Sequence, residues 1–491
     1  MRPAGVRPAR TALAAAALLM AFVAPGPAGA QERFRRTPPP PDPRPLELRL
    51  PAVERTILPN GLTVAVAVRP EAPLVTLQLV IRAGEADSPP ERPAVAMAAA
   101  RLIGRGTKML SADYLQNSIE AIGADLHVTV LMDYTVLTMH VLEEYLDRAF
   151  YLLRLVTLEA LFTERELGAV RRTLYWELFE RKKDPEVLAW GQLLRLLFAG
   201  HAYATGTYAE DVIKYITVRD VTAFYDRFYR PGNAAVLVSG PVDADTVRQR
   251  VEGHFGAWAG QAPGRPAAAR PPGNDRERIC FVESPDAPEA TIFAGNVIMD
   301  SYDPEFFPFL VLKQILGGTT RARLFMNLRE TRGYAYYAFS ETEFFRSCGV
   351  YWARARVRPD SVGPAVREIL REISAMAAEP ASPSEIEEAK AFIIGNLPLR
   401  FETSAGFADW MARYVALSLD EGQWDRGPER FQRVDAGRVW ETARRHLGAK
   451  PLVVVVGRPD GLPALLETFD AVEVYDAAGA LKYTARKGVG P

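Results

Sequence analysis

The 491-residue sequence contains few of the residues that bind metals or form disulfides. It has only two cysteines and five histidines. Two cysteines cannot build a four-cysteine zinc site or a disulfide-rich scaffold. None of the histidines stands in an H-x-x-x-H or H-x-x-E-H pattern, which limits the metal sites that the chain could form. The sequence leaves open whether Cys280 and Cys348 form a disulfide.

An excess of charge and long apolar runs are also lacking. The 59 lysines and arginines balance 60 aspartates and glutamates, for a formal net charge of −1. This balance argues against nonspecific binding to nucleic acid. Beyond the first 30 residues no stretch is apolar for long enough to span a bilayer. A hydrophobic content of 48% with 24% charged residues is ordinary for a globular protein and excludes a mainly disordered chain.

The N-terminus has the pattern of a signal peptide. Three arginines precede or border an apolar run at 11–24, and Ala28-Gly29-Ala30 supplies the small residues that signal peptidase reads. We expect cleavage after residue 30 and a mature protein that is exported, periplasmic or secreted, in an oxidising compartment. An uncleaved N-terminal anchor helix is the alternative.

Two changes of composition divide the rest of the chain. After the signal peptide at 1–30, residues 31–51 are rich in proline and charge and are expected to form an extended tether. Residues 259–276 are rich in proline and glycine and are typical of an interdomain linker. These segments leave an N-terminal domain at 52–258, a C-terminal domain at 277–475 and a tail at 476–491.

The two domains resemble each other. Each ends with an amphipathic helix, a short turn and an apolar strand that finishes in glycine, at 221–240 and at 439–457. Each also opens with a pair of strands, one around the Asn60-Gly61 turn and one within 280–298. A tandem duplication of one domain explains both similarities.

The hydrophobic periodicity of the first domain predicts an α+β fold. Strands are expected at 62–69, 74–82, 125–131 and 134–140, and helices at 91–104, 112–122, 142–157 and 163–200. Asp133 marks the turn between the last two strands. Each domain should therefore be a mainly antiparallel sheet packed on helices, and not a doubly wound sheet.

Several motifs follow one another in a recognisable order: LPNGLTVAV, the AGEADSPPE loop, IGRGT, ADYLQNSIEAIGADLHVTVLMDYTVLTMHVL and ILGGTTRARLFMNLRETRGYAYYAFS. Together they resemble the insulinase/pitrilysin-type metallopeptidases, in the branch that contains the mitochondrial processing peptidase. The resemblance covers almost the whole mature chain. It implies two tandem homologous domains that form half of a clamshell around an unfolded peptide.

The zinc motif of that family is degenerate in this chain. Relatives carry H-x-x-E-H on a helix, where residues i and i+4 share one face, and a distant glutamate completes the ligands. The corresponding positions hold Met97, Ala100 and Arg101, and the distal acid matches Glu177. A thioether, a methyl group and a fixed cation are poorly suited to hold zinc or to accept a proton. We expect no metal in this chain. Glu177 is then either a remnant that pairs with Arg101 or an ordinary exposed helix residue.

The second domain keeps a different part of the family's site. Relatives carry an arginine and a tyrosine seven residues apart after a glycine-rich turn, and these side chains bind the substrate backbone and the oxyanion. Here Gly317-Gly318 precede Arg329 and Tyr336. The resemblance implies that they supply hydrogen bonds to an oxyanion. The alternative is that Arg329 pairs with a local acid and Tyr336 fills a sheet face.

A lost zinc motif with a retained Arg/Tyr pair resembles the non-catalytic subunit of the two-chain members of the family. This implies a pseudoenzyme that has no cofactor of its own. It would form a heterodimer with a homologous subunit that carries the zinc, and the pair would act on unfolded peptides. A purely structural subunit, like the core subunits of the respiratory bc1 complex, is one alternative. A self-sufficient peptidase with an altered metal site is another.

Overall fold

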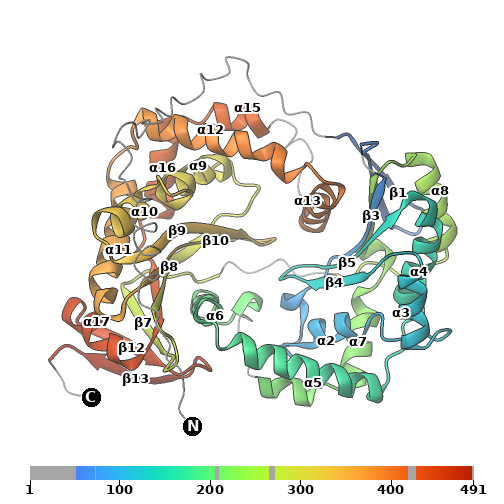
Figure 1. Ribbon diagram of the computed structural model, residues 1–491, viewed down its shortest axis with the longest axis horizontal. Helices are drawn as coiled ribbons and strands as arrows, with labels where there is room; N and C mark the ends of the chain where they lie inside the picture. The colour runs from blue at the N-terminus through green and yellow to red at the C-terminus, as the bar shows by residue number, and fades with distance from the viewer. Residues whose placement is uncertain (1–50, 72, 205–209, 265–270, 419–426, 489–491) are drawn as a thin grey trace, which may run out of the picture. The chain divides into compact units, whose positions relative to one another are not determined.

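Two β-sheets with helices packed on their faces make up the chain (Figure 1). The computed structural model describes residues 51–488, apart from 72, 205–209, 265–270 and 419–426. The predicted signal peptide and the predicted tether, except for Pro51, lie outside the described residues. We refer to residues 52–258 as the first half and to residues 277–488 as the second half.

The first half contains a six-stranded sheet in the order β1-β2-β6-β3-β5-β4, in which only β2 and β6 run parallel. Its strands are β1 (Val53–Ile57), β2 (Thr63–Val68), β3 (Leu74–Ile81), β4 (Leu126–Val130), β5 (Thr135–Leu142) and β6 (Ala234–Gly240). Its helices include α2 (Val95–Leu102), α3 (Ala112–Glu120), α4 (Leu146–Leu158), α5 (Glu164–Arg181), α6 (Pro185–Leu197), α7 (Val218–Phe228) and α8 (Ala244–Phe255). The predicted strands and helices are confirmed, with one difference. The helical run at 163–200 is two helices, because Asp184 caps a new helix that begins at Pro185.

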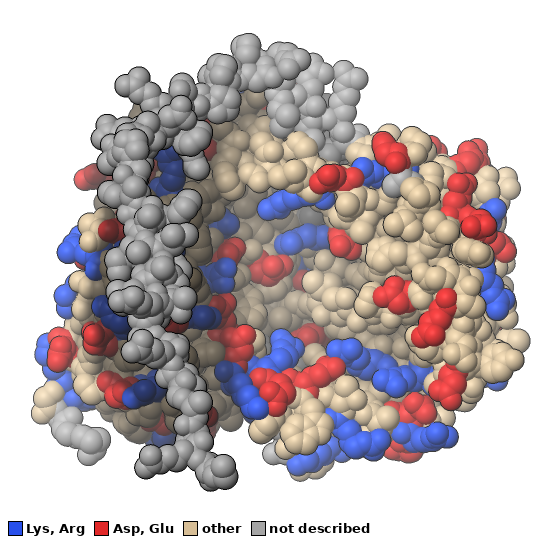
Figure 2. Space-filling model, viewed as in Figure 1, with Lys and Arg blue, Asp and Glu red and all other residues tan. Residues whose placement is uncertain are grey.

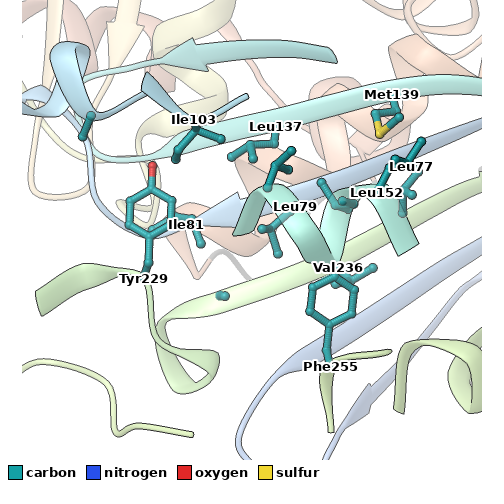
Figure 3. Packing of buried hydrophobic residues seen from close by; sticks show 14 of the residues in the cluster. Leu77, Leu79, Ile81, Ile103, Leu137, Met139, Leu152, Tyr229, Val236 and Phe255 are labelled. Carbon is teal, nitrogen blue, oxygen red and sulfur yellow. The ribbon is translucent and has the colours of Figure 1, made fainter. Parts of the chain in front are cut away.

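The core of the first half lies between this sheet and its helices. Alternate residues of β3 share one face of the sheet, so Leu77, Leu79 and Ile81 are all buried there (Figure 3). Leu152 of α4 and Phe255 of α8 pack in the same cluster. The period-2 pattern of the sequence therefore fixes which strand face meets the helices.

The second half contains a seven-stranded sheet in the order β13-β12-β7-β11-β8-β10-β9. Its strands are β7 (Arg278–Glu283), β8 (Ala290–Ile298), β9 (Ala335–Phe344), β10 (Gly349–Val357), β11 (Leu452–Gly457), β12 (Ala471–Tyr475) and β13 (Leu481–Arg486). Its helices include α9 (Phe306–Gly317), α10 (Arg323–Phe325), α11 (Val362–Ala378), α12 (Pro383–Arg400), α13 (Ser404–Leu417), α15 (Gly427–Gln432), α16 (Ala436–His446) and α17 (Leu462–Thr468). A π-helix, Met326–Thr331, follows α10 directly.

The strand order confirms the predicted duplication. The run β2-β6-β3-β5-β4 of the first sheet is repeated as β7-β11-β8-β10-β9 in the second. The parallel pair occupies the same place in both runs, as β2 with β6 and as β7 with β11. Each half is thus a mainly antiparallel sheet packed on helices.

Two details of the second half differ from the prediction. The strands within 280–298 do not pair with each other, because β11 lies between β7 and β8. Residues 476–491, expected to be a tail, include β13, which pairs with β12 and extends the sheet. The side chains of β13 are mostly exposed, so the strand carries no apolar pattern that would have revealed it.

Each sheet also packs against a helix from the other half. α6 packs on β8 and β11 of the second sheet through Leu188 and Leu193 (Figure 1). α13 packs on β3 and β6 of the first sheet through Phe407 and Met411. All described residues belong to one compact unit. The residues on either side of the predicted linker therefore do not form two separately packed domains. The domain boundaries stay a prediction.

The described residues also bear on two features of the composition. Both cysteines are buried and neither forms a disulfide. Burial raises the pKa of the Cys348 thiol to about 12. None of the described helices is both long enough and apolar enough to cross a bilayer.

Candidate functional site

The segment that carries Arg329 and Tyr336 is fixed against the edge of the second sheet. α9 ends at Gly317, where an added Cβ would lie 2.3 Å from the backbone nitrogen of Ser340 on β9. A glycine is therefore required for this close approach. The chain continues through α10 and the π-helix, turns at Gly333 and enters β9, the last strand of the sheet.

The structure brings Arg329 and Tyr336 together. Arg329 Nη1 donates a hydrogen bond to the backbone oxygen of Tyr336 at 3.0 Å. The guanidinium carbon also lies 5.4 Å from the centre of the Tyr336 ring and 4.9 Å from that of Phe325. A local acid is present as well, because Arg329 Nε lies 3.6 Å from a carboxylate oxygen of Glu330. These contacts hold the guanidinium over the tyrosine, and Arg329 Nη2 has no hydrogen-bond partner among the described residues.

Tyr336 does not fill a face of the sheet. The pairing register shifts between Ala335, opposite Val357, and Tyr337, opposite Arg356, so Tyr336 is the extra residue of a β-bulge. Its side chain is 70% exposed. Within the described chain its hydroxyl has no hydrogen-bond partner, which leaves the group able to bind a ligand.

The hydroxyl of the neighbouring Tyr337, unlike that of Tyr336, is hydrogen-bonded within the chain. Its hydroxyl donates a hydrogen bond to Glu186, at the start of α6. Arg354 Nη1 and Arg356 Nη2 also donate to Glu186, at 2.9 and 3.1 Å. Burial, followed by the interaction with Glu186, raises the pKa of Tyr337 to about 12. No sequence pattern points to this cluster, because 151 residues separate the glutamate from the tyrosine.

The positions predicted to match the zinc motif lie on α2, and the side chains there do not fit a metal. Arg101 Nη2 donates to Glu177 Oε2 at 2.9 Å, so the two side chains form the ion pair that the sequence left as one of two possibilities. Ala100 is 1% exposed, and Met97 packs against the core of the first half. The Arg101 guanidinium is therefore bound to the Glu177 carboxylate, which the family resemblance predicts as the third zinc ligand. Across the described ranges there is no group of three or more His, Cys, Asp or Glu residues that could hold a metal ion.

The Arg101–Glu177 pair and the Arg329–Tyr336 pair belong to different halves. The helix that carries Arg101 packs in the cluster of the first half. The π-helix that carries Arg329 packs in the separate cluster of the second half through Leu328. The two pairs are thus built on separate cores.

A cavity of about 630 Å³ lies between elements of the two halves. Figure 2 shows this side of the molecule hollowed, with side chains of both charges along the wall. Its acidic lining residues are Glu85, Asp133, Asp184, Glu186, Glu341 and Glu343, and its basic ones are Arg181, Arg354 and Arg413. Burial raises the pKa of Glu343, while Arg413, whose Nη2 lies 3.3 Å away, opposes the shift. The acids outnumber the bases, so the cavity favours a polar or cationic occupant over an anion.

A buried carboxylate links the halves beside this cavity. Asp133 accepts hydrogen bonds from the Tyr203 hydroxyl and from the backbone nitrogen of Arg346, both at 2.8 Å. Burial raises the pKa of Asp133, and both donors oppose the rise. The sequence predicted only that this residue marks a turn. Nearby, His201 Nδ1 accepts a hydrogen bond from the backbone nitrogen of Tyr203 at 3.1 Å.

Two family models match the chain. The model described as insulinase (peptidase family M16) matches residues 63–210. The model described as peptidase M16 inactive domain matches residues 215–393, which include Arg329 and Tyr336. The two matches follow each other along the chain, and the second begins within the first half, before α7 and β6.

Several known proteins share the sequence pattern or the fold. An uncharacterized zinc protease of Streptomyces coelicolor is 24% identical over 411 residues, which are 82% of this chain and 89% of the relative. A peptidase M16 inactive domain from Pseudomonas fluorescens has a TM-score of 0.76 and 20% identity, and the match covers 83% of this chain and 98% of that one. The periplasmic protease PqqL from Escherichia coli has a TM-score of 0.70 and 15% identity, over 84% of this chain and 46% of that one. At these identities the solved structures establish the fold.

Proposed function

The chain belongs to the insulinase-type (M16) family of metallopeptidases, and from this premise we propose that it is the non-catalytic subunit of an exported, two-chain zinc peptidase. The partner is a homologous chain with an intact H-x-x-E-H motif, and it supplies the zinc and the general base. The substrate is an unfolded peptide. This chain supplies Arg329 and Tyr336 to the partner's site.

One contrast carries the proposal. Arg101 is paired with Glu177 where a relative would bind its metal, whereas Arg329 and Tyr336 lie side by side with an unengaged phenol. Arg329 is always charged and presents several N–H donors in a fixed fork. The Tyr336 hydroxyl is a neutral donor at pH 7. Such preorganised donors stabilise the negative charge that develops on a peptide carbonyl oxygen during hydrolysis.

The central experiment is peptide hydrolysis by the reconstituted pair. Loss of one preorganised oxyanion donor costs about 2.7–4 kcal/mol, on the order of 100- to 1,000-fold in rate. We therefore expect Tyr336→Phe and Arg329→Ala to lower kcat by roughly that factor without weakening subunit assembly. Arg329→Lys keeps the charge but loses the fork, and should recover little activity.

Tyr334→Phe is the matched control, because this neighbouring tyrosine packs against the core of the second half. Its effect on turnover should be small. Normal turnover in both the Tyr336→Phe and the Arg329→Ala complexes would remove the catalytic role and leave a purely structural subunit. If the chain and a zinc-bearing homologue ran as separate species in gel filtration, and mixing left activity unchanged, the two-chain proposal would fail.

Export is a separate part of the proposal. The basic start, the apolar run at 11–24 and the small residues at 28–30 support removal of the first 30 residues. N-terminal sequencing of the chain from an exported fraction should begin at Gln31. Recovery of the intact N-terminus from the cytoplasmic fraction would contradict it.

A further inference from the structure

A second cavity, of about 300 Å³, lies in the second half where α9, α12 and α13 meet β9. Its wall includes seven aromatic side chains, those of Phe306, Phe344, Phe392, Phe401, Trp410, Tyr414 and Phe431. Trp410 lies 5.5 Å from Phe401 and 4.6 Å from Tyr414, ring centre to ring centre. Its volume is at the small end of the range for ligand pockets, roughly 300–1,000 Å³. The cavity therefore suits one large apolar side chain.

Positive charge dominates the polar part of the wall. Lys313, Arg400 and Arg413 line the cavity, and Glu341 is the one acid among its lining residues. Arg413 is paired with Glu343, at 3.3 Å. Lys313 Nζ lies 3.8 Å from Glu341, the outer limit for an ion pair. Arg400 forms no ion pair or side-chain hydrogen bond with the described residues, so its charge is available to a ligand.

Lys313 and Arg400 repel each other across this space. Burial lowers the pKa of Lys313, and the positive charge of Arg400 lowers it further, although Glu341 opposes the change. Two cations held beside an aromatic wall are stabilised when an anion binds between them. A ligand that joins a carboxylate to an apolar group could bind the two cations and the aromatic side chains at the same time.

The adjacent strand indicates which carboxylate fits. Glu341, Thr342 and Phe344 of β9 line the cavity, and β9 is the last strand of its sheet. In the described structure no strand pairs with its outer edge, whose N–H and C=O groups can bind another peptide backbone. A fatty acid has a carboxylate but no backbone groups to pair with this edge.

We propose that this cavity binds the C-terminal residue of a peptide that ends in a large apolar or aromatic side chain. The carboxylate lies between Lys313 and Arg400, and the side chain lies against Trp410. The inference rests on the proposed function only in taking a peptide as the ligand. It adds a requirement for a free C-terminus.

Calorimetric titration of the complete mature chain, without a partner, tests the proposal. The probe is an N-acetylated tetrapeptide, Ala-Ala-Ala-Phe, offered as the free acid and as the C-terminal amide. We expect the free acid to bind at least 10-fold more tightly than the amide, which corresponds to about 1.4 kcal/mol. Arg400→Gln and Lys313→Met should each reduce this preference several-fold.

Arg433→Gln is the matched control, because Arg433 is 79% exposed and outside the cavity. It should keep the full preference. The free acid should also change the tryptophan fluorescence of the wild-type chain but not that of Trp410→Phe.

Three results would overturn the proposal: no binding of the peptide acid, equal affinity for acid and amide, or an unchanged preference in Arg400→Gln. Binding of palmitate with no competition from the peptide acid would make the cavity a lipid site instead. Because the isolated chain is used, failure here leaves the turnover test of Tyr336 with the partner unaffected. Conversely, a chain that forms no complex can still show the preference for a free C-terminus.

Discussion

Arg101 donates a hydrogen bond to Glu177 across 2.9 Å and so joins the helix of the degenerate zinc motif to the helix that carries the distal acid. The two side chains are 49% and 37% exposed. An exposed pair of this kind stabilises a protein by about 1 kcal/mol or less. Its main consequence is therefore chemical, because the guanidinium neutralises the carboxylate that the family resemblance predicts as the third zinc ligand.

The pairing predicts that a metal site can be restored on α2. Residues 97 and 101 are four positions apart and share one face of the helix. Position 101 already reaches Glu177. We expect the double variant Met97→His, Arg101→His to bind about one zinc ion per chain, as measured by metal analysis after dialysis. The wild-type chain should bind none.

Adding Glu177→Gln to the double variant is the control, and it should abolish zinc binding, because two histidines alone leave the site incomplete. Zinc binding that survives this third change would mean that the motif has been assigned to the wrong positions. Absence of zinc from a correctly folded double variant would mean the same.

Two adjacent tyrosines should separate stability from catalysis. Tyr337 donates a hydrogen bond to Glu186 and so joins β9 to α6 of the first half. We expect Tyr337→Phe to lower the free energy of unfolding by about 1–3 kcal/mol, since a charged acceptor loses a donor. Tyr336 is 70% exposed, so Tyr336→Phe should leave the urea midpoint unchanged. The reverse order of effects would show that the bulge places the other tyrosine in the proposed site.

Local patterns revealed most of the strands but not their partners. The alternation around Asp133 predicts β4 and β5, because a strand with one buried face repeats every two residues. The apolar face of α6 is equally visible in the sequence. Nothing in it shows that the face packs on the second sheet, since a helix of this kind fits any apolar surface.

The candidate site was predictable to a similar extent. The family resemblance pointed to Arg329 and Tyr336, and the turn at Gly333 brings the two residues into contact. The contacts of Glu186 with Tyr337 and Arg354 could not be predicted from the sequence, because these partners lie on strands of the other half. Asp133 is 4% exposed, although an aspartate in a turn normally faces water.

Asp87 should make stability depend on pH. Burial raises its pKa to about 6, and the nearby Asp133 adds to the rise, while the Gly84 backbone nitrogen and the Arg346 and Arg227 charges oppose it. The folded protein therefore binds this proton more tightly than the unfolded chain, whose ordinary value is 3.8. The ionised carboxylate costs stability above pH 6, and stability increases as the pH falls from 7 toward 4.

Asp87→Asn removes this titration and keeps a side-chain oxygen to accept from Gly84. We expect the variant to gain up to about 2 kcal/mol over wild type at pH 7.5, and the gain should shrink toward pH 4.5. Urea unfolding at several pH values measures the difference. Asp113→Asn, at an exposed position of helix α3, is the control and should show no such trend. A gain that stays constant across this range would contradict the assignment.

The hydroxyl of Tyr203 should stabilise the contact between the halves. It donates to Asp133 at 2.8 Å, and both residues are almost fully buried, at 1% and 4% exposure. Arg346, in the turn between β9 and β10, donates its backbone N–H to the other carboxylate oxygen. Tyr203→Phe leaves a buried carboxylate with one donor fewer, so we expect a loss of about 1–3 kcal/mol in the free energy of unfolding.

Tyr351→Phe provides the matched control, because Tyr351 is also buried, at 2% exposure, and its hydroxyl has no hydrogen-bond partner in the structure. Equal losses in the two variants would show that the Tyr203 hydroxyl contributes nothing through Asp133.

The loss from Tyr203→Phe should also be smaller in an Asp133→Asn background, since a neutral amide depends less on the donor than a carboxylate does. It should likewise diminish as the pH falls through the raised pKa of Asp133, because a protonated carboxyl needs the phenol less than an ionised one. A loss that is the same at every pH and in both backgrounds would assign the effect to packing of the ring and not to the hydrogen bond with Asp133.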